Sequence, residues 1–183
     1  MVKIITPEQS IEILNNGGLV VCPTDTIWGF GCSIWNYKAI KKIREIKGKG
    51  TEFMSIAVNS TEELGYFAEL DSKKKGKIKD LLKEGSYYTF VLNKRFTNDC
   101  LNLINCSKKI GIRVIKHPAV EIITKYAGPV ITTSANIHNM PAIKDIESLD
   151  KKLIDSAYLV KGNCYWGKAS KVYDVEEDRM IRQ

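Results

Sequence analysis

The sequence predicts an α/β fold of the mixed α+β kind, built as a single domain over residues 1–183 with a twisted mixed β-sheet and flanking helices. Short apolar runs alternate with segments of helical periodicity, which is typical of a sheet with helices packed on it. The chain has 183 residues, enough for one domain with a sizeable core. Its 44% hydrophobic and 27% charged residues are the ordinary balance of a globular protein.

The N-terminal elements carry clear boundary signals. Val2 to Ile5 predicts a strand. Thr6 and Gln9 form a T-x-x-Q capping box with a proline at the first helical position, and the helix should end at Gly17-Gly18. Leu19 to Cys22 then predicts a buried strand that runs into a loop.

Further elements follow from caps and periodicity. Asn36 predicts the start of a helix with apolar positions at helical spacing. Ser60 with Glu63 predicts a second capping box, and Asp71 to Lys83 predicts a lysine-rich helix. Another helix should begin at Pro118. The remaining predicted strands are Ser55 to Val58, Tyr87 to Leu92, Ile110 to Ile115, Val130 to Thr132, Ala157 to Val160 and Lys171 to Val175.

Composition narrows the class of protein. Met1 to Thr6 contains one Lys and no long apolar stretch, and no window approaches the run of about 18 apolar residues that a membrane span needs. We therefore expect a cytoplasmic protein. The five cysteines form no C-x-x-C pair, which indicates reduced thiols rather than a zinc site. The net charge of +7 is compatible with an anionic partner such as a nucleotide or RNA.

The loop from Pro23 to Gly31 is the first candidate for chemistry. It combines two hydroxyls (Thr24 and Thr26), the carboxylate of Asp25 and two glycines directly after a buried strand. Such hydroxyls can hold a small polar substrate, and glycines let the backbone approach a ligand. The alternative is a turn in which the Thr and Asp side chains cap backbone groups.

Basic residues supply the next two candidates. Lys47-Gly48-Lys49-Gly50 ends a basic helix, where two lysines beside glycines can hold a phosphate chain. The alternative is simple compensation of the helix dipole. Arg113 lies in an otherwise apolar strand, so it needs an anionic partner if it faces inward. That partner is a carboxylate or phosphate ligand, or else an internal Asp or Glu.

Two later segments combine small polar groups. Thr132 to Asn136 follows a strand, where Ser134 and Asn136 are well placed for a ligand or, alternatively, for an N-cap or a turn. Gly167 to Asp174 mixes glycine, lysine and the hydroxyl of Ser170, and it can also be a plain loop that leads into a strand.

Together and in this order, these segments resemble the YrdC-like family in its short, single-domain form. The resemblance covers the chain from about Leu19 to the C-terminus. It rests on P-T-D-T-I-W-G-F-G from Pro23, K-G-K-G from Lys47, Y-T-F-V-L from Tyr88, I-G-I-R-V-I-K-H-P from Ile110, P-V-I-T-T-S-A-N from Pro129 and A-S-K-V-Y-D from Ala169.

The resemblance implies a twisted sheet with a basic concave groove and a threonylcarbamoyl-AMP synthase activity. The substrates would be L-threonine, bicarbonate and ATP, with Mg2+ accompanying the ATP and pyrophosphate released. The product would serve the N6-threonylcarbamoyl modification of adenosine in tRNA, so tRNA or a downstream threonylcarbamoyl-transferase complex are the expected partners.

The resemblance also implies roles for single residues. Lys47 and Lys49 would hold the triphosphate, and Arg113 would neutralise the threonine carboxylate or the carbamate. Thr24 and Thr26 would bind the polar groups of threonine. The nucleotide would be held by hydrogen bonds from Thr89, Ser134, Asn136 and Ser170.

The chain departs from the family pattern in three places. Lys49 stands where the family has Arg, Phe53-Met54-Ser55 replaces a K-P-L or K-G-L segment, and Glu84 to Tyr87 replaces a P-G-P segment. Two alternatives therefore stay open: a non-catalytic RNA-binding protein with a basic groove, and a carbamoyl-adenylate module of the hydrogenase-maturation type.

Overall fold

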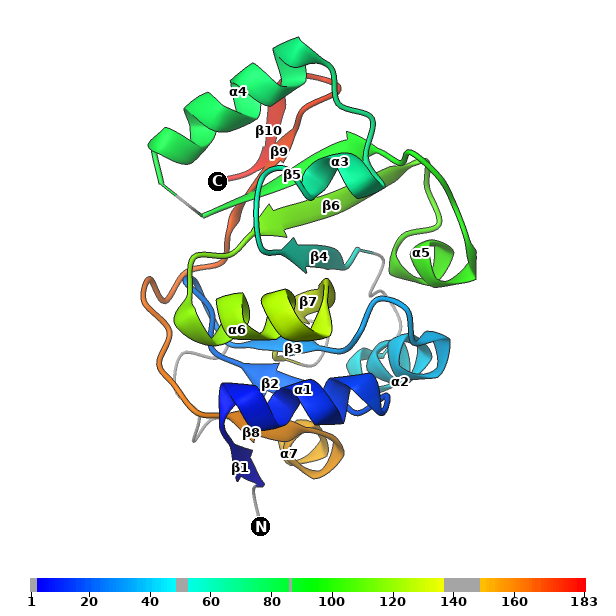
Figure 1. The fold of residues 1–183 in the computed structure, drawn as a ribbon, viewed down its shortest axis with the longest axis vertical. Coiled ribbons are helices and arrows are strands. Elements are labelled where there is room, and N and C mark those ends of the chain that lie inside the picture. The colour runs from blue at the N-terminus through cyan, green and yellow to red at the C-terminus, as the bar shows by residue number, and fades with distance from the viewer. Residues whose placement is uncertain (1–2, 49–52, 86, 137–148) are drawn as a thin grey trace.

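A computed structural model describes residues 3–48, 53–85, 87–136 and 149–183, with the backbone alone at 152–154. In these residues ten strands form one sheet in the order β1-β8-β2-β3-β7-β4-β6-β5-β9-β10, which Figure 1 shows from bottom to top. The strands are β1 (Ile4–Ile5), β2 (Val20–Cys22), β3 (Gly29–Gly31), β4 (Ser55–Val58), β5 (Tyr88–Asn93), β6 (Lys109–Val114), β7 (Val130–Ser134), β8 (Tyr158–Val160), β9 (Lys171–Asp174) and β10 (Arg179–Arg182).

Seven helices accompany the sheet in the described part of the chain. They are α1 (Pro7–Asn15), α2 (Tyr37–Lys47), α3 (Leu64–Phe67), α4 (Ser72–Lys83), α5 (Asp99–Ile104), α6 (Pro118–Ala127) and α7 (Lys151–Ser156). The sheet is mixed: β8 runs parallel to β1 and β2, β4 to β6 and β5 to β9, whereas the other neighbours are antiparallel. The predicted mixed α/β fold is confirmed.

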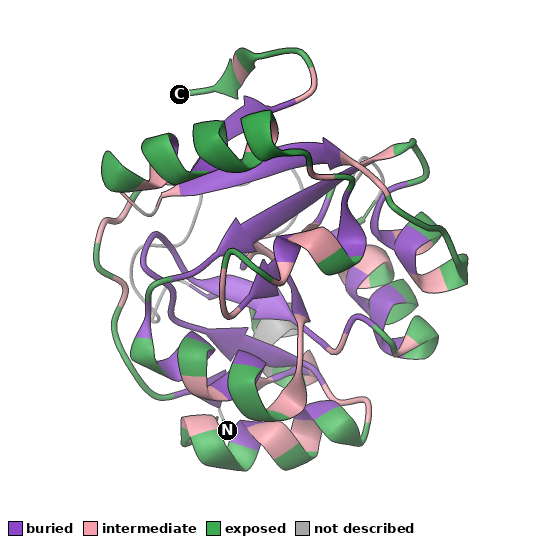
Figure 2. Ribbon diagram, turned by 45° about the horizontal axis from the view of Figure 1, so that its top comes forward, coloured by how far each residue is buried: buried purple, intermediate pink, exposed green. Residues whose placement is uncertain are grey.

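The two faces of the sheet have different partners, because successive side chains of a strand point to opposite sides. Val20 and Val160 pack with α1 and α6, which lie side by side over the lower half of the sheet in Figure 1. The next residue, Val21, belongs to the larger core on the other face, with Ile40 of α2 and Leu101 of α5. Figure 2 shows the central strands buried, whereas the C-terminal strand β10 and the outer surfaces of the helices are largely exposed.

The central strands carry small or polar residues on one face. Ser55 of β4 pairs with Gly111 of β6 on one side and with Thr132 of β7 on the other. Arg113 follows two positions after Gly111 and therefore shares that face, whereas Ile112 between them packs into the larger core. This alternation leaves a face of small and polar side chains in the centre of the sheet.

Most of the predicted caps are confirmed. Thr6 and Gln9 form both hydrogen bonds of the capping box, and the Oδ1 atom of Asn36 accepts from the N–H of Ala39 at 2.9 Å. The box predicted at Ser60 and Glu63 is wrong. The helix there begins only at Leu64, and the Glu63 carboxylate instead accepts from the N–H of Asn59 at 3.2 Å, behind it in the chain.

The reading of Gly29 to Gly31 as part of a loop is also wrong. These residues form β3, fully buried and paired with both β2 and β7. A Cβ on Gly31 would lie 2.5 Å from the carbonyl oxygen of Ile131, so glycine is needed here for close packing rather than for a turn. Helices α5 and α7 and strand β10 were not predicted.

Two expectations about composition can be compared with the structure. All five cysteines are free thiols, as expected. Within the described ranges, no helix combines the length and the apolar character that crossing a membrane requires.

Candidate active site

A cavity of about 330 Å3 lies over the small-residue face of the central strands. Its size falls within the range of small-molecule sites. Among the described residues, the charged side chains that line it are two arginines, Arg113 and Arg182, which agrees with a basic concave groove. The remaining lining residues are Thr24, Thr26, Ile27, Trp28, Gly29, Phe53, Ser55, Thr89, Thr132, Thr133, Ser134, Asn136, Ala169, Ser170 and Val172.

One wall of the cavity is a set of four mutually bonded residues, which we call the Arg113 cluster: Thr24, Asp25, Thr26 and Arg113. The guanidinium of Arg113 donates to the Thr26 hydroxyl at 2.9 Å and forms a buried ion pair with Asp25. The hydroxyl of Thr24 lies 2.9 Å from that of Thr26 and 2.7 Å from the carbonyl oxygen of Ile27. The loop between β2 and β3 is therefore tied to strand β6 by side chains.

The charge of Arg113 is countered inside the protein. Burial lowers the pKa of its guanidinium, and the nearby Asp25 carboxylate opposes that shift. Asp25 also accepts the backbone N–H of Lys116 at 3.1 Å. Of the two partners that the sequence left open for Arg113, the structure contains the internal carboxylate. The Nε atom of Arg113 nevertheless has no hydrogen-bond partner among the described residues, although it is buried.

A second wall is the Ser170 cluster, formed by Thr89, Ser170 and Arg182. The hydroxyls of Thr89 and Ser170 lie 2.8 Å apart. Arg182 of β10 donates from Nε and Nη2 to the carbonyl oxygen of Ser170, at 3.0 and 2.8 Å. The sequence analysis missed Arg182. Its strand has four residues and is mostly exposed, so neither hydrophobic alternation nor a buried charge marks it.

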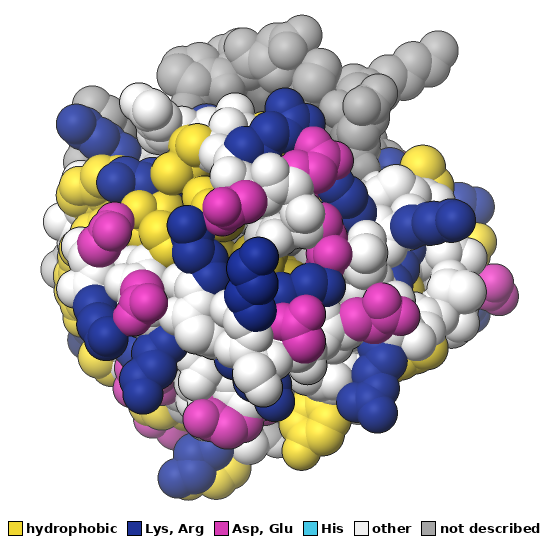
Figure 3. Space-filling model, turned by 90° about the horizontal axis from the view of Figure 1, so that it is seen from above, with side chains coloured by type: hydrophobic (Ala, Val, Ile, Leu, Met, Phe, Trp, Pro, Cys, Tyr) yellow, Lys and Arg dark blue, Asp and Glu magenta, His cyan; other side chains and the backbone are white. Residues whose placement is uncertain are grey.

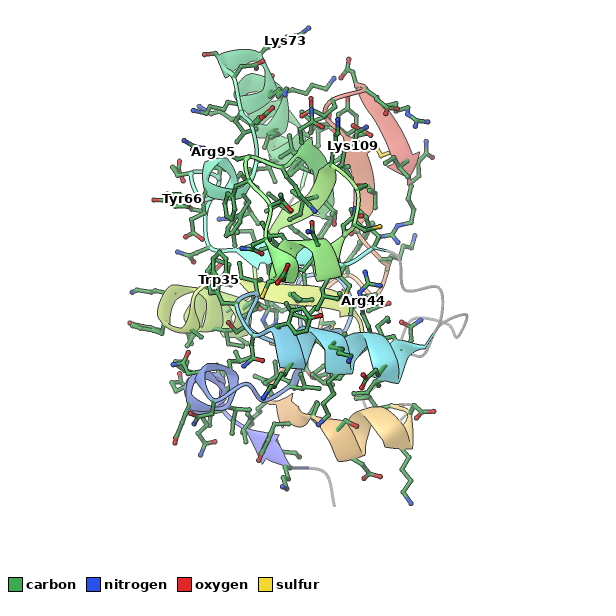
Figure 4. All side chains as sticks on the ribbon, turned by 90° about the vertical axis from the view of Figure 1, so that its right-hand side faces the viewer. Trp35, Arg44, Tyr66, Lys73, Arg95 and Lys109 are labelled. Carbon is green, nitrogen blue, oxygen red and sulfur yellow. The ribbon has the colours of Figure 1, made fainter. Side chains whose placement is uncertain are left out.

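The hairpin that brings Arg182 to the cavity is fixed at its turn by Asp174. One carboxylate oxygen of this buried residue accepts from the N–H groups of Glu176 and Glu177, at 3.0 and 3.2 Å. The other oxygen binds the ammonium of Lys109 at 2.7 Å, beside β9 and β10 in Figure 4. Asp174, the last residue of the A-S-K-V-Y-D segment, thus has a structural role behind the site.

Lys47 occupies a cage of oxygen atoms rather than open space. Its ammonium donates to the carbonyl oxygens of Ser134 and Asn136, at 2.7 and 2.8 Å, and to the Asn136 side chain at 3.2 Å. These three acceptors match the three protons of an ammonium. Burial lowers the pKa of Lys47 to about 8. We call Lys47, Ser134 and Asn136 the Lys47 cage.

The predicted site residues are therefore largely brought together. Thr24, Thr26, Arg113, Thr89 and Ser170 line the cavity, as do Ser134 and Asn136, whose side chains bond to each other. Lys47 lies behind that loop, and the triphosphate role expected for it stays a prediction. Lys49 lies outside the described residues.

The described residues contain no group of three or more His, Cys, Asp or Glu that could hold a metal ion. The carboxylate beside the cavity, Asp25, is already engaged by Arg113 and by the N–H of Lys116. This donor set does not fit a metal ion held by the protein alone.

The fold and the cavity define an α/β protein with a polar cavity over the open face of a twisted mixed sheet. The family model Sua5/YciO/YrdC, described as "Telomere recombination", matches residues 12–183. The chain belongs to this family, as the motifs indicated.

Similar proteins fit this assignment. A Methanocaldococcus jannaschii protein, provisionally named threonylcarbamoyl-AMP synthase, is 31% identical over 93% of this chain and 80% of its own. The crystal structure of Escherichia coli YciO has the same fold, with a TM-score of 0.85 at 22% identity over 100% of this chain and 96% of that one. Sua5 of P. abyssi, crystallised with L-threonine, gives 0.77 at 20% identity over 95% of this chain, which spans only 54% of Sua5.

Proposed function

We propose that this protein is a threonylcarbamoyl-AMP synthase that uses L-threonine, bicarbonate and ATP and releases pyrophosphate. The observation that carries the proposal is one cavity lined by both motif-bearing walls: the Arg113 cluster and the Ser170 cluster, with the Ser134–Asn136 loop beside them. The family membership of the chain and the name of its M. jannaschii relative support the same activity.

The reaction needs no nucleophile from the protein. The neutral amine of threonine adds to CO2 derived from bicarbonate and loses a proton, which gives a carbamate. A carbamate oxygen attacks the α-phosphorus of ATP, the bond from that phosphorus to the bridging oxygen breaks, and pyrophosphate leaves. The enzyme has to hold two anions in line and stabilise the charge on the leaving group. Polar walls around a single cavity suit that task.

The Arg113 cluster is the proposed threonine site. Its internal hydrogen bonds fix the positions of the Thr24 and Thr26 hydroxyls before any ligand arrives. Because Asp25 balances the charge of Arg113, we expect the guanidinium to act on a ligand through directed N–H groups more than through net charge, and its buried Nε has no partner among the described residues. A carboxylate or carbamate oxygen that accepts from Nε would also remove the cost of a buried donor without a partner. Arg113 would therefore bind the ligand through hydrogen bonds rather than only neutralise its charge.

The polar groups of the Ser170 cluster and of the Ser134–Asn136 loop are the proposed nucleotide site. Thr89, Ser170, Ser134 and Asn136 would bond to the nucleotide, and the exposed guanidinium of Arg182 adds a positive charge at the same wall. Lys47 would act on the nucleotide mainly by holding the Ser134–Asn136 loop. Lys49 keeps its expected contact with the triphosphate as a proposal.

Mg2+ would arrive bound to ATP, since the described protein residues do not form a ligand set for it. Bound there, the ion would neutralise charge on the phosphate oxygens. The product would pass to a threonylcarbamoyl transferase that acts on tRNA, and we place the reaction in the cytoplasm.

The surface around the lysine-rich helix α4 gives little support to the RNA-binding alternative. Figure 3 shows Lys and Arg side chains interspersed with Asp and Glu on that end of the molecule. Two of the lysines form ion pairs across to the β9–β10 turn, Lys74 with Glu176 at 2.9 Å and Lys77 with Asp178 at 3.1 Å. A surface with both signs of charge is a poor electrostatic footprint for a phosphate backbone.

The test is direct detection of the product. The purified protein is incubated with L-threonine, ATP, Mg2+ and carbon-13 bicarbonate, and the nucleotides are analysed by mass spectrometry. We expect a threonylcarbamoyl-AMP peak that carries one carbon-13 atom and disappears when L-threonine is left out. In a second incubation, carbon-13 carbamoyl phosphate replaces threonine and bicarbonate, and labelled carbamoyl-AMP there would instead indicate the hydrogenase-maturation type of module. No labelled nucleotide in either incubation would refute catalysis.

A further inference from the structure

Phe53 is an aromatic residue in the cavity at a place where the family pattern has a basic one. The K-P-L or K-G-L segment of the family is replaced here by Phe53-Met54-Ser55. Met54 is buried in the core and Ser55 bonds to the carbonyl oxygen of Thr132 at 3.0 Å, so both face the protein. Phe53 lines the cavity and keeps 40% of its surface exposed. A phenyl ring exposed inside a polar cavity calls for an explanation.

The ring lies against the backbone of Gly111 in strand β6. A Cβ on Gly111 would lie 2.5 Å from both the Cε1 and the Cζ atoms of Phe53, too close for real atoms. The backbone of Gly111 is ordinary strand, so a glycine is needed at this position for space and not for an unusual φ. Glycine and phenyl ring thus fit together: the strand supports one side of the ring and leaves part of it open to the cavity.

The neighbours of the ring are the polar groups of the Ser170 cluster. A Cβ on Gly111 would also lie 3.3 Å from the Cγ2 atom of Thr89, so Phe53 and Thr89 flank one glycine. The hydroxyl of Thr89 is 2.8 Å from that of Ser170, which in turn is bonded to Arg182. The place therefore combines a supported aromatic surface with hydrogen-bonding groups at its edge.

We propose that Phe53 is the stacking platform for the purine base of the nucleotide. The inference deepens the proposed function and rests on it. A phenyl ring cannot replace a lysine toward phosphate, because its face carries the negative end of a quadrupole. It does suit a heteroaromatic base, since every base offers a π-face and stacking on an aromatic side chain is tolerant of sequence. In this chain, stacking of the base on Phe53 takes the place of the contact that a lysine would make with phosphate.

The first test separates the base from the phosphates. Binding of ATP and of inorganic tripolyphosphate is measured by calorimetry for the wild type and for Phe53→Leu, which removes the aromatic face and keeps an apolar side chain. We expect ATP affinity to fall roughly tenfold, as for one lost stacking contact, with the affinity for tripolyphosphate unchanged. Phe96→Leu is the matched control, because Phe96 is 42% exposed and lines a different hollow.

A double-mutant cycle tests the geometry. Gly111→Ala pushes the ring off its support, so it should weaken ATP binding in the wild type but add little to Phe53→Leu. Additive losses would overturn the stacking role, and so would unchanged ATP affinity in Phe53→Leu or an equal loss for tripolyphosphate. Wild-type protein that binds no ATP at all would refute the proposed function, which keeps the two failures apart.

Discussion

The Arg113 cluster and the Ser170 cluster line the same cavity but are built differently. Thr24, Asp25 and Thr26 are at most 3% exposed, and they bond to one another and to Arg113. The Ser170 wall is more open, because Arg182 is exposed and the neighbouring Phe53 is 40% exposed. One wall is fixed by a buried ion pair and hydrogen bonds, whereas the other is held by hydrogen bonds alone and carries an exposed guanidinium.

The departures from the family pattern that fall on described residues lie at the more open of the two walls. The Arg113 cluster keeps every motif residue, because a change to any member would leave a buried charge or hydroxyl without its partner. Phe53 and Tyr87, each from a segment that departs from the family pattern, lie beside the open wall, where the carbonyl oxygen of Tyr87 accepts the N–H of Lys171 at 2.8 Å. Both of these departures therefore lie outside the set of buried polar residues that bond to one another around Arg113.

The largest expected effect comes from breaking the buried pair. Asp25→Ala leaves the guanidinium of Arg113 buried without its carboxylate, so the free energy of unfolding should fall by about 3–5 kcal/mol. Urea unfolding followed by circular dichroism measures it. Asp80→Ala is the matched control: it breaks the exposed pair with Lys83 and should leave the urea midpoint where it is. Equal midpoints for wild type and Asp25→Ala would contradict the account of the fixed wall.

The Lys47 cage should matter next. Lys47→Met removes the donors that hold the carbonyl oxygens of Ser134 and Asn136, so the loop that carries both nucleotide ligands loses its support. We expect turnover to drop by about 100-fold, the size of one lost preorganised contact. Lys42→Met, on the exposed side of the same helix, should keep wild-type turnover. Thermal melts of both variants show whether the protein is still folded.

Removal of a single hydrogen bond to the nucleotide should have a smaller effect than loss of the Lys47 cage. Ser134→Ala or Asn136→Ala should weaken ATP binding by about 1–3 kcal/mol, the range for a lost hydrogen bond to a charged group. The melting temperature should change little. Calorimetric titration with ATP gives the affinities, and equal values for wild type and both variants would remove this loop from the nucleotide site.

The smallest effect is a proton taken up on binding. Burial lowers the pKa of Lys47 to about 8, so near pH 8 roughly half of the free protein carries Lys47 uncharged. A nearby triphosphate favours the ammonium and raises that pKa, so ATP binding at pH 8 should take up a fraction of a proton. At pH 6.5 Lys47 is already charged and the uptake should vanish. Calorimetry in buffers with different ionisation enthalpies measures the uptake, and its absence in Lys47→Met assigns it.

Sequence alone predicted what depends on local chemistry. The capping box at Thr6 and the cap at Asn36 need only neighbouring residues, and both are present. Strand β3 was missed because its two glycines are typical of turns, while the reason for them is the close approach of strand β7. The Glu63 carboxylate was assigned to a box although it turns back to Asn59.

In the candidate site too, contacts between residues far apart in the chain were not predicted. Motif order located the residues of both walls apart from Arg182, since each wall is built from motif residues whose side chains line the cavity or bond to one that does. The pairing of Arg113 with Asp25 stayed open, because the two lie 88 positions apart and any acidic residue would have served. Arg182 gave no signal, because its contact with Ser170 depends on the β9–β10 hairpin. The cage around Lys47 likewise depends on a contact with Ser134, 87 positions away.

The central claim is that the two walls bring a threonine carbamate and ATP together in one cavity without a protein nucleophile. Pyrophosphate release from ATP tests it most directly when L-threonine and bicarbonate are omitted in turn. The account predicts release only when both are present, with the wild-type rate lost in Arg113→Lys, which cannot keep the fork of contacts to Asp25 and Thr26. Release that continues without threonine, or full activity in Arg113→Lys, would contradict it.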